Sequence, residues 1–456
     1  MKRRKFLRDL TLATPALTLL PGTAVACSKE GDDAPVQWSG KVIVIGAGIA
    51  GLAAAELLLA KGLDVSILEA SSRIGGRIRV LSGFADFDIE LGAEEIHGNR
   101  SEWYRLVQSS GAKLLNSGGN DFYFYNNILY NDNNVDNAAD LTKVFDFVDK
   151  AHNNFRVDET VLQNLQKSNV PAPAYPMVNA LLCNEYGTSN DRLSIQGISE
   201  EDELWSAGDD NYVIAGRSYI TILQEKFANA IKNVITNTPV KTINYTSDKI
   251  SVEAADNQVF TADRIIITVP LTILQQNDIN FIPALPSDKR AAIQQIGMGA
   301  GMKIILKFNQ RFWPANTGSI YSTGYVPEFW ATNEGRGNTP VLTAFIMGEN
   351  AEFLSAQGQN AVPIVLSELD KMFANKASAN FVAAHIADWS KEPFIKGAYS
   401  YPIVGGGIAM RQTLAKTVNN KLFFAGEATH FAGHNSTVHG ALETGVRAAN
   451  ELLNIK

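Results

Sequence analysis

The chain has 456 residues, a formal net charge of −7, 45% hydrophobic residues and 19% charged residues. This length favours two or more domains with a large core, and the composition excludes a disordered or collagen-like chain. The acidic balance leaves no surplus of cations to neutralise phosphates, which argues against a general nucleic-acid-binding protein. Two cysteines are too few for a disulfide framework or a multi-cysteine metal site, and the six histidines show no HExxH or similar ligand spacing. We therefore expect neither a disulfide framework nor a metal site.

The first 26 residues have the features of a removable export signal. The basic segment Lys2–Arg8 contains a twin arginine, and a moderately apolar stretch from Leu10 to Ala26 follows it. Two prolines interrupt this stretch, which is too short to span a bilayer comfortably. A twin arginine favours export by the Tat route, so we expect an exported protein, either periplasmic or anchored to the membrane as a lipoprotein.

Cys27 follows the apolar stretch, and two interpretations of it stay open. In the first it is a lipoprotein cysteine that is acylated after cleavage, with residues 27–35 as a polar linker; in the second it is a cysteine left beside a peptidase site. Ala24 is a weak residue for a lipid-attachment sequence. We favour lipidation, and we expect the protein to contact a membrane only through this anchor.

Residues 41–69 have the pattern of a dinucleotide-binding βαβ unit. The β-branched run Lys41–Ile45 predicts a buried parallel strand, the Ala/Leu-rich stretch Leu52–Ala60 predicts a helix, and Asp64–Leu68 predicts a second strand that ends at Glu69. A G-x-G-x-x-G motif joins the first strand to the helix, and an acidic residue follows the second strand. This is the context in which the motif binds dinucleotides.

Each glycine of the motif has its own expected role. Gly46 permits the tight turn, Gly48 lets the backbone approach a pyrophosphate, and Gly51 allows the helix and strand to pack closely. The helix N-terminus offers free N–H groups and a positive dipole end to the phosphates. Glu69 can accept hydrogen bonds from a ribose diol.

The segment Arg73–Arg77 places an arginine on each side of a glycine pair. Gly76 allows close backbone approach, and Arg77 can reach a phosphate or a flavin. At this point the sequence resembles the flavin-containing amine oxidases, whose two-domain FAD fold carries an R-x-G-G-R motif here. The resemblance favours FAD over NAD as the dinucleotide.

The resemblance continues in Glu90–Gly98, which contains Gly92 and Ala93. The end of this segment, Ile-His97-Gly, is similar to the polyamine oxidase branch of the family. Between residues 426 and 442 the sequences Gly-Glu-Ala-Thr-His and Ser-Thr-Val-His-Gly-Ala-Leu are again similar to polyamine oxidases.

Two central segments also match the family. Val240 precedes two predicted strands, Ile250–Glu253 and Arg264–Thr268. As a hairpin they resemble the inserted meander of the family's FAD domain, in which a backbone group at the Val240 position meets adenine. The strand Gly299–Phe308 resembles the family strand that carries a flavin lysine, and Lys303 falls on that position.

The resemblance implies catalytic roles for four residues. Lys303 would lie beside flavin N5 through a bridging water and assist oxygen reduction; the alternative is a surface lysine on an edge strand. Trp389 and Tyr399 would guide an amine past the flavin with their aromatic faces, unless they are simply core residues. His97 could hydrogen-bond a substrate nitrogen and accept a proton, or it could be a structural histidine.

The expected FAD site combines the glycine motif with the matching positions elsewhere. The carboxylate of Glu427 can hold a ribityl hydroxyl or a water on the pyrophosphate, and Ser436 or Thr437 can cap a helix over Val438–Leu452. The positive N-terminus of that helix can stabilise negative charge on the reduced flavin. The residues expected to bind FAD are Gly46, Gly48, Gly51, Glu69, Arg73, Gly76, Arg77, Gly92, Ala93, Val240, Gly426, Glu427, Thr437 and Val438.

Two positions depart from the monoamine oxidases within this family. Ala398 stands where they have a flavin-linking cysteine, and Thr437 stands where they have a second aromatic wall. Cys183 lies in an apolar run and is expected in the core. We therefore expect non-covalent FAD and a polyamine-like substrate rather than a monoamine.

These matches predict an α/β fold with a discontinuous Rossmann-like FAD-binding domain of the GR2 type and an α+β substrate-binding domain with a mixed sheet. Phe122–Tyr130 predicts a hairpin in the substrate domain. The expected segments are a signal (1–26), a linker (27–35), the FAD-binding domain (36–98, 213–298 and 412–456) and the substrate domain (99–212 and 299–411).

The expected function is oxidation of a primary or secondary amine to an imine, with O2 reduced to hydrogen peroxide. An L-amino-acid oxidase of the same fold is an alternative, because Arg100 is near the segment where a carboxylate clamp would stand. A ligand-binding lipoprotein derived from a flavoprotein is a non-enzymatic alternative. The candidate anchors for distant ammonium groups are Glu94, Glu95, Glu200, Glu201, Asp202, Glu203, Asp209 and Asp210.

Overall fold

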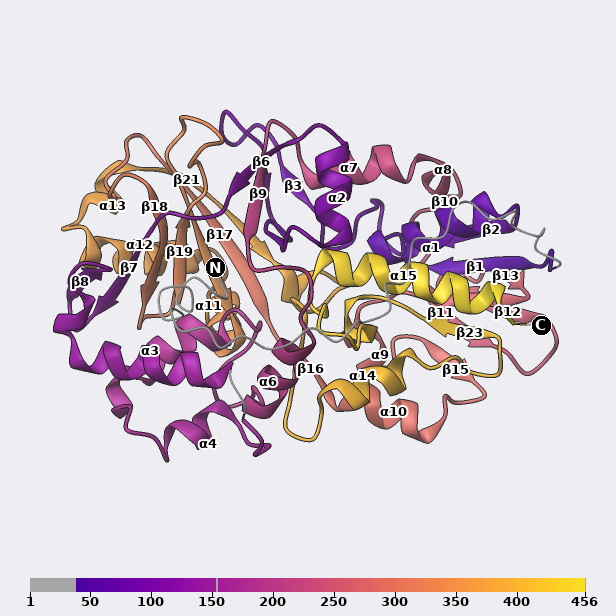
Figure 1. The fold of residues 1–456 in the computed structure, drawn as a ribbon. Coiled ribbons are helices and arrows are strands. Elements are labelled where there is room, and N and C mark those ends of the chain that lie inside the picture. The colour runs from indigo at the N-terminus through magenta and orange to yellow at the C-terminus, as the bar shows by residue number, and fades with distance from the viewer. Residues whose placement is uncertain (1–37, 153–154, 456) are drawn as a thin grey trace, which may run out of the picture.

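The computed structural model describes residues 38–152 and 155–455, so the expected signal segment and Cys27 lie outside the described residues. Figure 1 shows two halves side by side. The half at the right of the view is built around a parallel sheet, and the half at the left around a larger mixed sheet. This is the two-part α/β architecture that the sequence predicted.

A five-stranded parallel sheet forms the centre of the first half. Strand β1 (Lys41–Ile45) is almost wholly apolar because both faces of the sheet are covered: Val42 and Val44 face one core, whereas Ile43 and Ile45 face another. In spatial order the strands are β10 (Val234–Ile235), β2 (Asp64–Leu68), β1, β14 (Arg264–Ile267) and β23 (Leu422–Phe424).

Two long helices cover one face of this sheet. Helix α1 (Ile49–Ala60) follows β1, and α15 (Val438–Leu453) packs against it. Their backbones approach closely because Gly445 lies where any Cβ would overlap the carbonyl oxygen of Ala50. The layer is completed by α2 (Glu102–Ser109), α7 (Tyr219–Lys226) and α8 (Ala228–Ile231).

A second sheet and three short helices cover the other face. The sheet has the strand order β13 (Val259–Ala262), β12 (Ile250–Ala254), β11 (Val240–Asn244) and β15 (Asn280–Ile282). The helices are α9 (Leu271–Gln275), α10 (Ser287–Gln294) and α14 (Ile408–Ala415).

The predicted hairpin between Ile250–Glu253 and Arg264–Thr268 is wrong. Strand β12 pairs with β13, which the sequence analysis missed, around a turn in which Asn257 has a φ of +67°. Strand β14 instead enters the parallel sheet beside β1. The change of sheet occurs at Asp263, whose Oδ2 accepts the N–H of Lys41 at 2.8 Å.

The second half is centred on a seven-stranded mixed sheet. Its neighbouring strands are antiparallel except for the parallel pair β18–β7. The predicted hairpin is confirmed as β7–β8, with Asn126 and Asn127 at positive φ in the turn. In spatial order the strands are β21 (Phe381–Asp388), β17 (Gly301–Phe308), β20 (Val341–Met347), β19 (Glu328–Ala331), β18 (Thr317–Ser322), β7 (Asn120–Tyr125) and β8 (Ile128–Asn131).

Helices cover both faces of the mixed sheet, each over its own core. The side of Tyr123 and Tyr321 is covered by α3 (Ala139–Ala151), α4 (Val161–Leu165), α5 (Tyr175–Val178), the π-helix η4 (Asn179–Cys183) and α6 (Ile195–Leu204). The side of Phe122 and Ile304 is covered by α11 (Gly348–Gln357), α12 (Ala361–Met372) and α13 (Lys376–Asn380). Cys183 is buried in the first of these cores, as expected, and burial raises the pKa of its thiol.

Three small sheets connect the halves. One of them joins β5 (Ile96–His97), β9 (Asn211–Ala215) and β6 (Lys113–Asn116), so it crosses the predicted limits at residues 98 and 212. The domain boundaries therefore stay a prediction. The other two sheets are β3 (Val80–Leu81) with β4 (Ile89–Glu90), and β16 (Ile296–Met298) with β22 (Ser400–Pro402).

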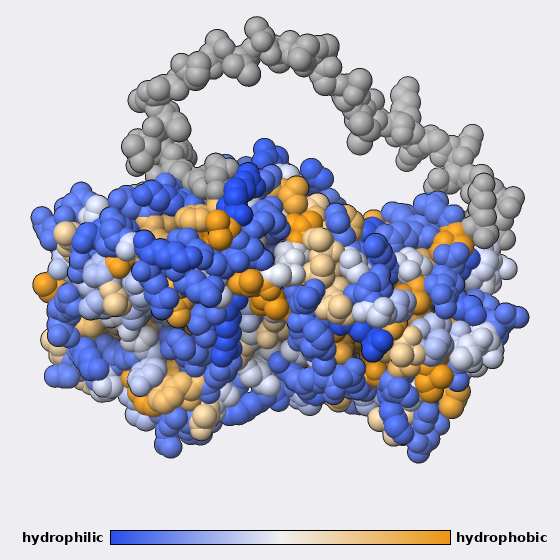
Figure 2. Space-filling view, turned by 90° about the horizontal axis from the view of Figure 1, so that it is seen from below, coloured by the Kyte–Doolittle hydropathy of each residue, from blue (hydrophilic) through white to orange (hydrophobic). Residues whose placement is uncertain are grey.

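Hydrophilic residues cover most of the face of the molecule that Figure 2 shows. On the face shown in Figure 2, hydrophobic residues form small separate patches among hydrophilic ones. The exposed hydrophobic side chains include Val157, Val259 and Val382, which come from different parts of the chain. Within residues 38–152 and 155–455, no helix is long and apolar enough to cross a membrane.

Candidate active site

A cavity of about 940 Å³ lies between the two halves of the molecule. One end is bordered by the glycine motif, the R-x-G-G-R segment and the start of α15, and the other by the sheet face that carries Lys303. All of the predicted site residues line the cavity except Gly51. Its volume is at the upper end of the range for ligand sites, roughly 300–1,000 Å³.

The three motif glycines differ as the sequence predicted. Gly46 has a φ of +104°, and a Cβ on Gly51 would overlap the carbonyl oxygen of Gly46, so both positions exclude a side chain. Gly48 is the N-cap of α1, which begins at Ile49 rather than Leu52. No atom lies within 4 Å of the position that a Gly48 Cβ would take. That space beside the helix N-terminus fits a pyrophosphate.

Glu69 holds the neighbouring turn. Its Oε2 accepts the N–H of Ala47 at 2.7 Å, and its Oε1 accepts the N–H of Ser71 at 2.8 Å. Oε1 also accepts from Ser71 Oγ at 2.8 Å, and Oε2 can accept a further hydrogen bond. The position therefore fits the predicted ribose contact, which stays a prediction.

Arg77 and Glu427 meet at the cavity wall. Arg77 Nη1 donates to Glu427 Oε1 at 2.9 Å, and Glu427 Oε2 accepts from Ser400 Oγ at 2.6 Å and from the N–H of Ser436 at 3.1 Å. Burial by itself raises the pKa of Glu427, but Arg77, Ser400 and Arg411 outweigh it and hold the pKa below its ordinary value. Glu427 is therefore a carboxylate that fixes Arg77.

The rest of the R-x-G-G-R segment is shaped by its own contacts. Arg73 Nη1 donates to the carbonyl oxygen of Gly76 at 2.9 Å, and the N–H of Ala93 donates to the carbonyl oxygen of Arg77 at 3.2 Å. A Cβ on Gly92 would overlap that same carbonyl oxygen. Arg73 and Arg77 thus border the cavity from a rigid turn.

Helix α15 begins at the cavity, as predicted. Thr437 is its N-cap, and Thr437 Oγ1 accepts the N–H of Gly440 at 2.9 Å. Thr437 and Val438 both line the cavity, and so does Val240 at the start of β11. The positive end of the α15 dipole therefore borders the space where a cofactor would lie.

Lys303 is buried and not at a sheet edge, which removes the alternative of a surface lysine. It lies on β17 between β21 and β20, and its Nζ donates to Glu94 Oε2 at 2.7 Å and to the carbonyl oxygen of Glu90 at 3.1 Å. Arg336 Nη1 binds the other oxygen of Glu94 at 2.7 Å. The Trp330 ring centroid is 4.9 Å from Lys303 Nζ.

Two buried carboxyl groups near Lys303 differ in charge. Burial raises the pKa of Glu90 to about 8, so Glu90 is mostly protonated at pH 7. Burial also raises the pKa of Glu94, but Lys303 and Arg336 outweigh it and hold the pKa below its ordinary value. The carboxylate of Glu94 therefore carries the negative charge of this group.

The predicted residues Trp389, Tyr399 and His97 also line the cavity. Trp389 Nε1 and Tyr399 OH donate to backbone carbonyl oxygens at 3.0 and 2.7 Å, which fixes both rings at the cavity wall. His97 lies at the end of β5 and lines the cavity, and its Nδ1 is 3.2 Å from Asn211 Oδ1. The structure brings all three to the cavity that Lys303 lines, and their catalytic roles stay predictions.

Four residues of one cavity wall were not predicted from the sequence: Glu328, Trp330, Phe345 and Met347. Lys303, Phe345 and Glu328 stand directly opposite one another on the neighbouring strands β17, β20 and β19. Two residues further along their strands, Met347 and Trp330 face the same side, and all five line the cavity. Alternation along β19 and β20 is the signal that could have found them.

Glu328 is an unusual member of this wall. It is buried, and its Oε1 accepts from Ser319 Oγ at 2.7 Å. Burial raises the pKa of Glu328 to about 7. Glu95 and Glu185 also line the cavity, so this end is acidic.

Most of the predicted ammonium anchors lie elsewhere. Glu94 and Glu95 line the cavity, but the six acidic residues between positions 200 and 210 do not. Glu201 pairs with Arg411, and Asp202 with His152, on helix α6 or its surroundings. Arg100 is also outside the cavity lining, with its Nε donating to a backbone carbonyl oxygen.

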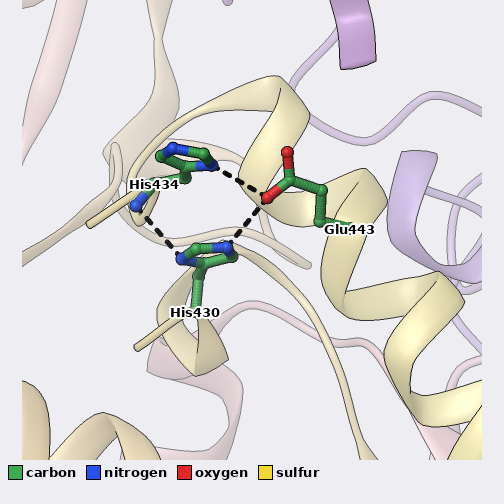
Figure 3. A group of neighbouring side chains, drawn as sticks. All are labelled: His430, His434 and Glu443. Carbon is green, nitrogen blue, oxygen red and sulfur yellow. Dashed lines mark hydrogen bonds and ion pairs between the residues drawn. The ribbon is translucent and has the colours of Figure 1, made fainter. Parts of the chain in front are cut away.

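Two histidines and one glutamate of α15 form a group with the composition of a metal site. The ligand atoms of His430, His434 and Glu443 lie within 4.8 Å of one another, and no other such group occurs in the described ranges. Figure 3 shows both rings turned toward Glu443 Oε2, at 2.9 Å from each. His430 Nδ1 accepts the backbone N–H groups of Ala432 and His434, which places the proton on Nε2.

That tautomer does not fit a metal site. A metal ligand needs the lone pair of His430 Nε2, and the ring would then carry its proton on Nδ1, against two N–H donors. Both imidazole rings are instead hydrogen-bonded to Glu443 Oε2. The expectation that the protein holds no metal stays a prediction.

Comparisons with known proteins agree with this geometry. The family model described as flavin containing amine oxidoreductase matches residues 49–201 and 217–453. Polyamine oxidase 4 of Oryza sativa subsp. japonica is 31% identical over 444 residues, which cover 90% of this chain and 88% of that protein. Lysine-specific histone demethylase 1 homolog 2 of the same organism is 29% identical, and the match covers 92% of this chain and 58% of that protein.

A solved structure shows the same fold. Cyclohexylamine oxidase from Brevibacterium oxydans IH-35A superposes with a TM-score of 0.76 and 21% sequence identity. The superposition covers 91% of this chain and 99% of that one. Both halves of the molecule and the cavity between them therefore belong to one known architecture.

Proposed function

The chain belongs to the flavin-containing amine oxidoreductase family, in its polyamine oxidase branch, and we propose that it oxidises an amine that carries a second cationic group. The amine loses two electrons and two protons: a hydride leaves the carbon next to the reacting nitrogen and a proton leaves the nitrogen, giving an imine that water hydrolyses. The electrons pass to O2, which takes up two protons and leaves as hydrogen peroxide.

FAD is the non-covalent cofactor of this enzyme, and when bound it accepts the hydride from the amine. The residues present fit it: Gly48 leaves space at the N-terminus of α1, and Arg77 can meet phosphate or flavin. The N-terminus of α15 would face the flavin. Ala398 lines the cavity where a covalent link would require a cysteine.

The observation that favours a substrate with a second cationic group is the set of acidic side chains in the cavity wall, Glu328, Glu95 and Glu185. Glu328 stands in the same row as Lys303, and Glu95 and Glu185 line the same end of the cavity. A carboxylate in this wall would attract the distal ammonium group of a diamine. The relative named polyamine oxidase 4 supports the same substrate class.

The reacting nitrogen, unlike the distal ammonium group, must be neutral. An alkylamine that titrates near 10.4 costs about 4–5 kcal/mol to deprotonate at pH 7. Trp389, Tyr399 and Phe345 reduce contact with water, which favours the neutral amine. His97 lines the same cavity and would hydrogen-bond that nitrogen.

An L-amino-acid oxidase would need a cation in the cavity to bind the substrate carboxylate, and neither of the two candidate arginines supplies it. An L-amino acid needs a cation for its carboxylate, and Arg100 lies outside the cavity lining. Arg336 is already bound to Glu94 and does not line the cavity either. We therefore favour amines over amino acids.

A substrate panel tests the proposal. Purified holoenzyme should be bleached anaerobically, and should form peroxide in air, with 1,4-diaminobutane and spermidine. We expect kcat/KM for 1,4-diaminobutane to exceed that for butylamine by about tenfold or more, the effect of one added charge contact. No bleaching with any amine would overturn the proposal, and faster turnover of L-phenylalanine or L-lysine would favour an amino-acid oxidase.

We also propose that the protein is exported and lipidated at Cys27, which rests on the twin arginine at Arg3 and Arg4. Changing both arginines to lysine should keep the chain in the cytoplasm. Cys27→Ser should release an exported chain from the membrane fraction. Recovery of the wild-type chain only in the soluble periplasmic fraction would argue against lipidation.

A further inference from the structure

The group Lys303–Glu94–Arg336 is built around one buried carboxylate with two cations. Glu94 binds Lys303 Nζ through one oxygen and Arg336 Nη1 through the other, both at 2.7 Å. The three side chains are 4%, 4% and 6% exposed. Such a group keeps a fixed geometry because each polar end is tied to a partner.

The charges of the group do not cancel. Lys303 and Glu94 alone would form a neutral pair, whose field falls off quickly with distance. Arg336 adds a second cation, so the group carries a net charge of +1. Glu90 lies beside the group and is mostly protonated at pH 7, which leaves that charge in place.

Arg336 is held for this contact by its loop. The loop joins β19 to β20, and Asp86 accepts the N–H groups of Asn338 and Thr339 at 2.8 and 2.9 Å. A Cβ on Gly337 would overlap the Phe87 ring. The loop is thus fitted against residues 86–87, and its arginine points inward to a buried carboxylate.

We propose that Arg336 is a positioning residue that acts through Glu94 to keep a net positive charge at Lys303, and that this charge speeds the reduction of O2. The inference rests on the proposed use of O2 as electron acceptor. In that step O2 gains two electrons from the reduced cofactor and two protons, and it leaves as hydrogen peroxide. Negative charge develops on O2 before both protons arrive, and a nearby cation stabilises it.

The position of Arg336 makes its effect selective. Lys303 and Glu94 line the cavity, but Arg336 does not. Arg336 therefore contacts neither the amine nor the cofactor. Its loss should slow the reaction with O2 and leave the reaction with the amine nearly unchanged.

The test measures the two half-reactions separately. Dithionite-reduced holoenzyme is mixed with O2, so the result does not depend on the amine. We expect Arg336→Gln to lower the second-order rate constant about tenfold, the effect of about 1.4 kcal/mol, and to change anaerobic bleaching by 1,4-diaminobutane less than about twofold. Arg336→Lys, which keeps the charge, should retain most of the wild-type rate with O2.

A double variant separates charge from structure. Glu94→Gln with Arg336→Gln again leaves a net charge of +1 at Lys303, so it should recover a rate with O2 within a few-fold of wild type. Arg311→Gln, which removes an exposed pair with Glu334, is the matched control and should change neither readout.

Three results would overturn the inference. The first is an unchanged rate with O2 in Arg336→Gln, and the second is an equal loss in both half-reactions. The third is a double variant as slow as Arg336→Gln. Failure of every amine to bleach the enzyme would instead count against the proposed function, because the reaction of the dithionite-reduced enzyme with O2 is measured independently.

Discussion

Arg77 and Glu427 are 350 positions apart in the sequence, yet Arg77 Nη1 and Glu427 Oε1 lie 2.9 Å apart at the cavity wall. The pair joins the segment after the first βαβ unit to the segment before α15. Both segments border the cofactor end of the cavity. The cofactor site therefore depends on a contact that closes the FAD-binding half of the molecule.

Glu427→Gln should weaken this closure. The glutamine keeps the size of the side chain but leaves Arg77 without its anion. Glu427 is 5% and Arg77 26% exposed, so the loss should lie between that of an exposed and that of a buried pair, about 1–3 kcal/mol. We expect the urea midpoint of the apoprotein to fall and the purified protein to contain less FAD. Glu352→Gln, which breaks an exposed pair with Arg192, is the control and should cost less than about 1 kcal/mol. Equal losses in the two variants would contradict the prediction.

Alanine substitutions at two glycines of the motif should have different effects, Gly51→Ala on folding and Gly48→Ala on FAD binding. Gly51→Ala forces a Cβ into the carbonyl oxygen of Gly46, so it should destabilise the chain with or without FAD. Gly48→Ala meets no atom of the chain within 4 Å, and the φ of −74° suits alanine. It should fold with at most about 1 kcal/mol lost at the N-cap but bind FAD about tenfold or more weakly, because the methyl group takes the pyrophosphate space.

Chemical unfolding of the apoprotein and titration with FAD check the two variants. The fluorescence of free FAD reports binding, and the urea midpoint reports folding. A Gly48→Ala protein with wild-type affinity for FAD would show that the pyrophosphate lies elsewhere. A Gly51→Ala protein of wild-type stability would show that α1 and the turn are not in close contact.

The cofactor end could be predicted because its residues are neighbours in the sequence. Gly46, Gly48 and Gly51 act through one turn, and their spacing shows this directly. The substrate end could be predicted only where a family motif marks a residue, as at Lys303, because Phe345 and Glu328 are brought beside it only by the register of three strands. Arg336 comes from a loop with no motif of its own. The wrongly predicted hairpin around Asp263 has the same cause, because the local sequence pattern predicts a strand but not the sheet that the strand joins.

The group His430–His434–Glu443 should not behave as a zinc site. Binding would move the proton of His430 from Nε2 to Nδ1, against two backbone N–H groups. We expect neither excess zinc nor EDTA to change the thermal unfolding of the holoenzyme. A zinc-dependent rise in Tm that His434→Ala abolishes would contradict this reading of the hydrogen bonds.

Glu328 should give diamine oxidation a pH dependence of its own. The pKa of Glu328 is about 7 because the carboxyl group is buried, so raising the pH from 6 to 8 converts it from mostly protonated to mostly ionised. Under the proposed function the carboxylate attracts a distal ammonium group, so kcat/KM for 1,4-diaminobutane should rise with pH. The rise should exceed that for butylamine by up to about tenfold over this range.

Butylamine corrects for the step that both substrates share, which is deprotonation of the reacting nitrogen. Glu328→Gln cannot ionise, so it should remove the extra rise for the diamine and leave the butylamine profile unchanged. Ser319→Ala is the matched control: it removes the hydrogen bond to Glu328 at 2.7 Å but keeps the carboxyl group. Because that hydrogen bond favours the ionised form, its loss should shift the extra rise to higher pH without abolishing it. An extra rise that persists in Glu328→Gln would assign the distal ammonium to Glu95 or Glu185 instead.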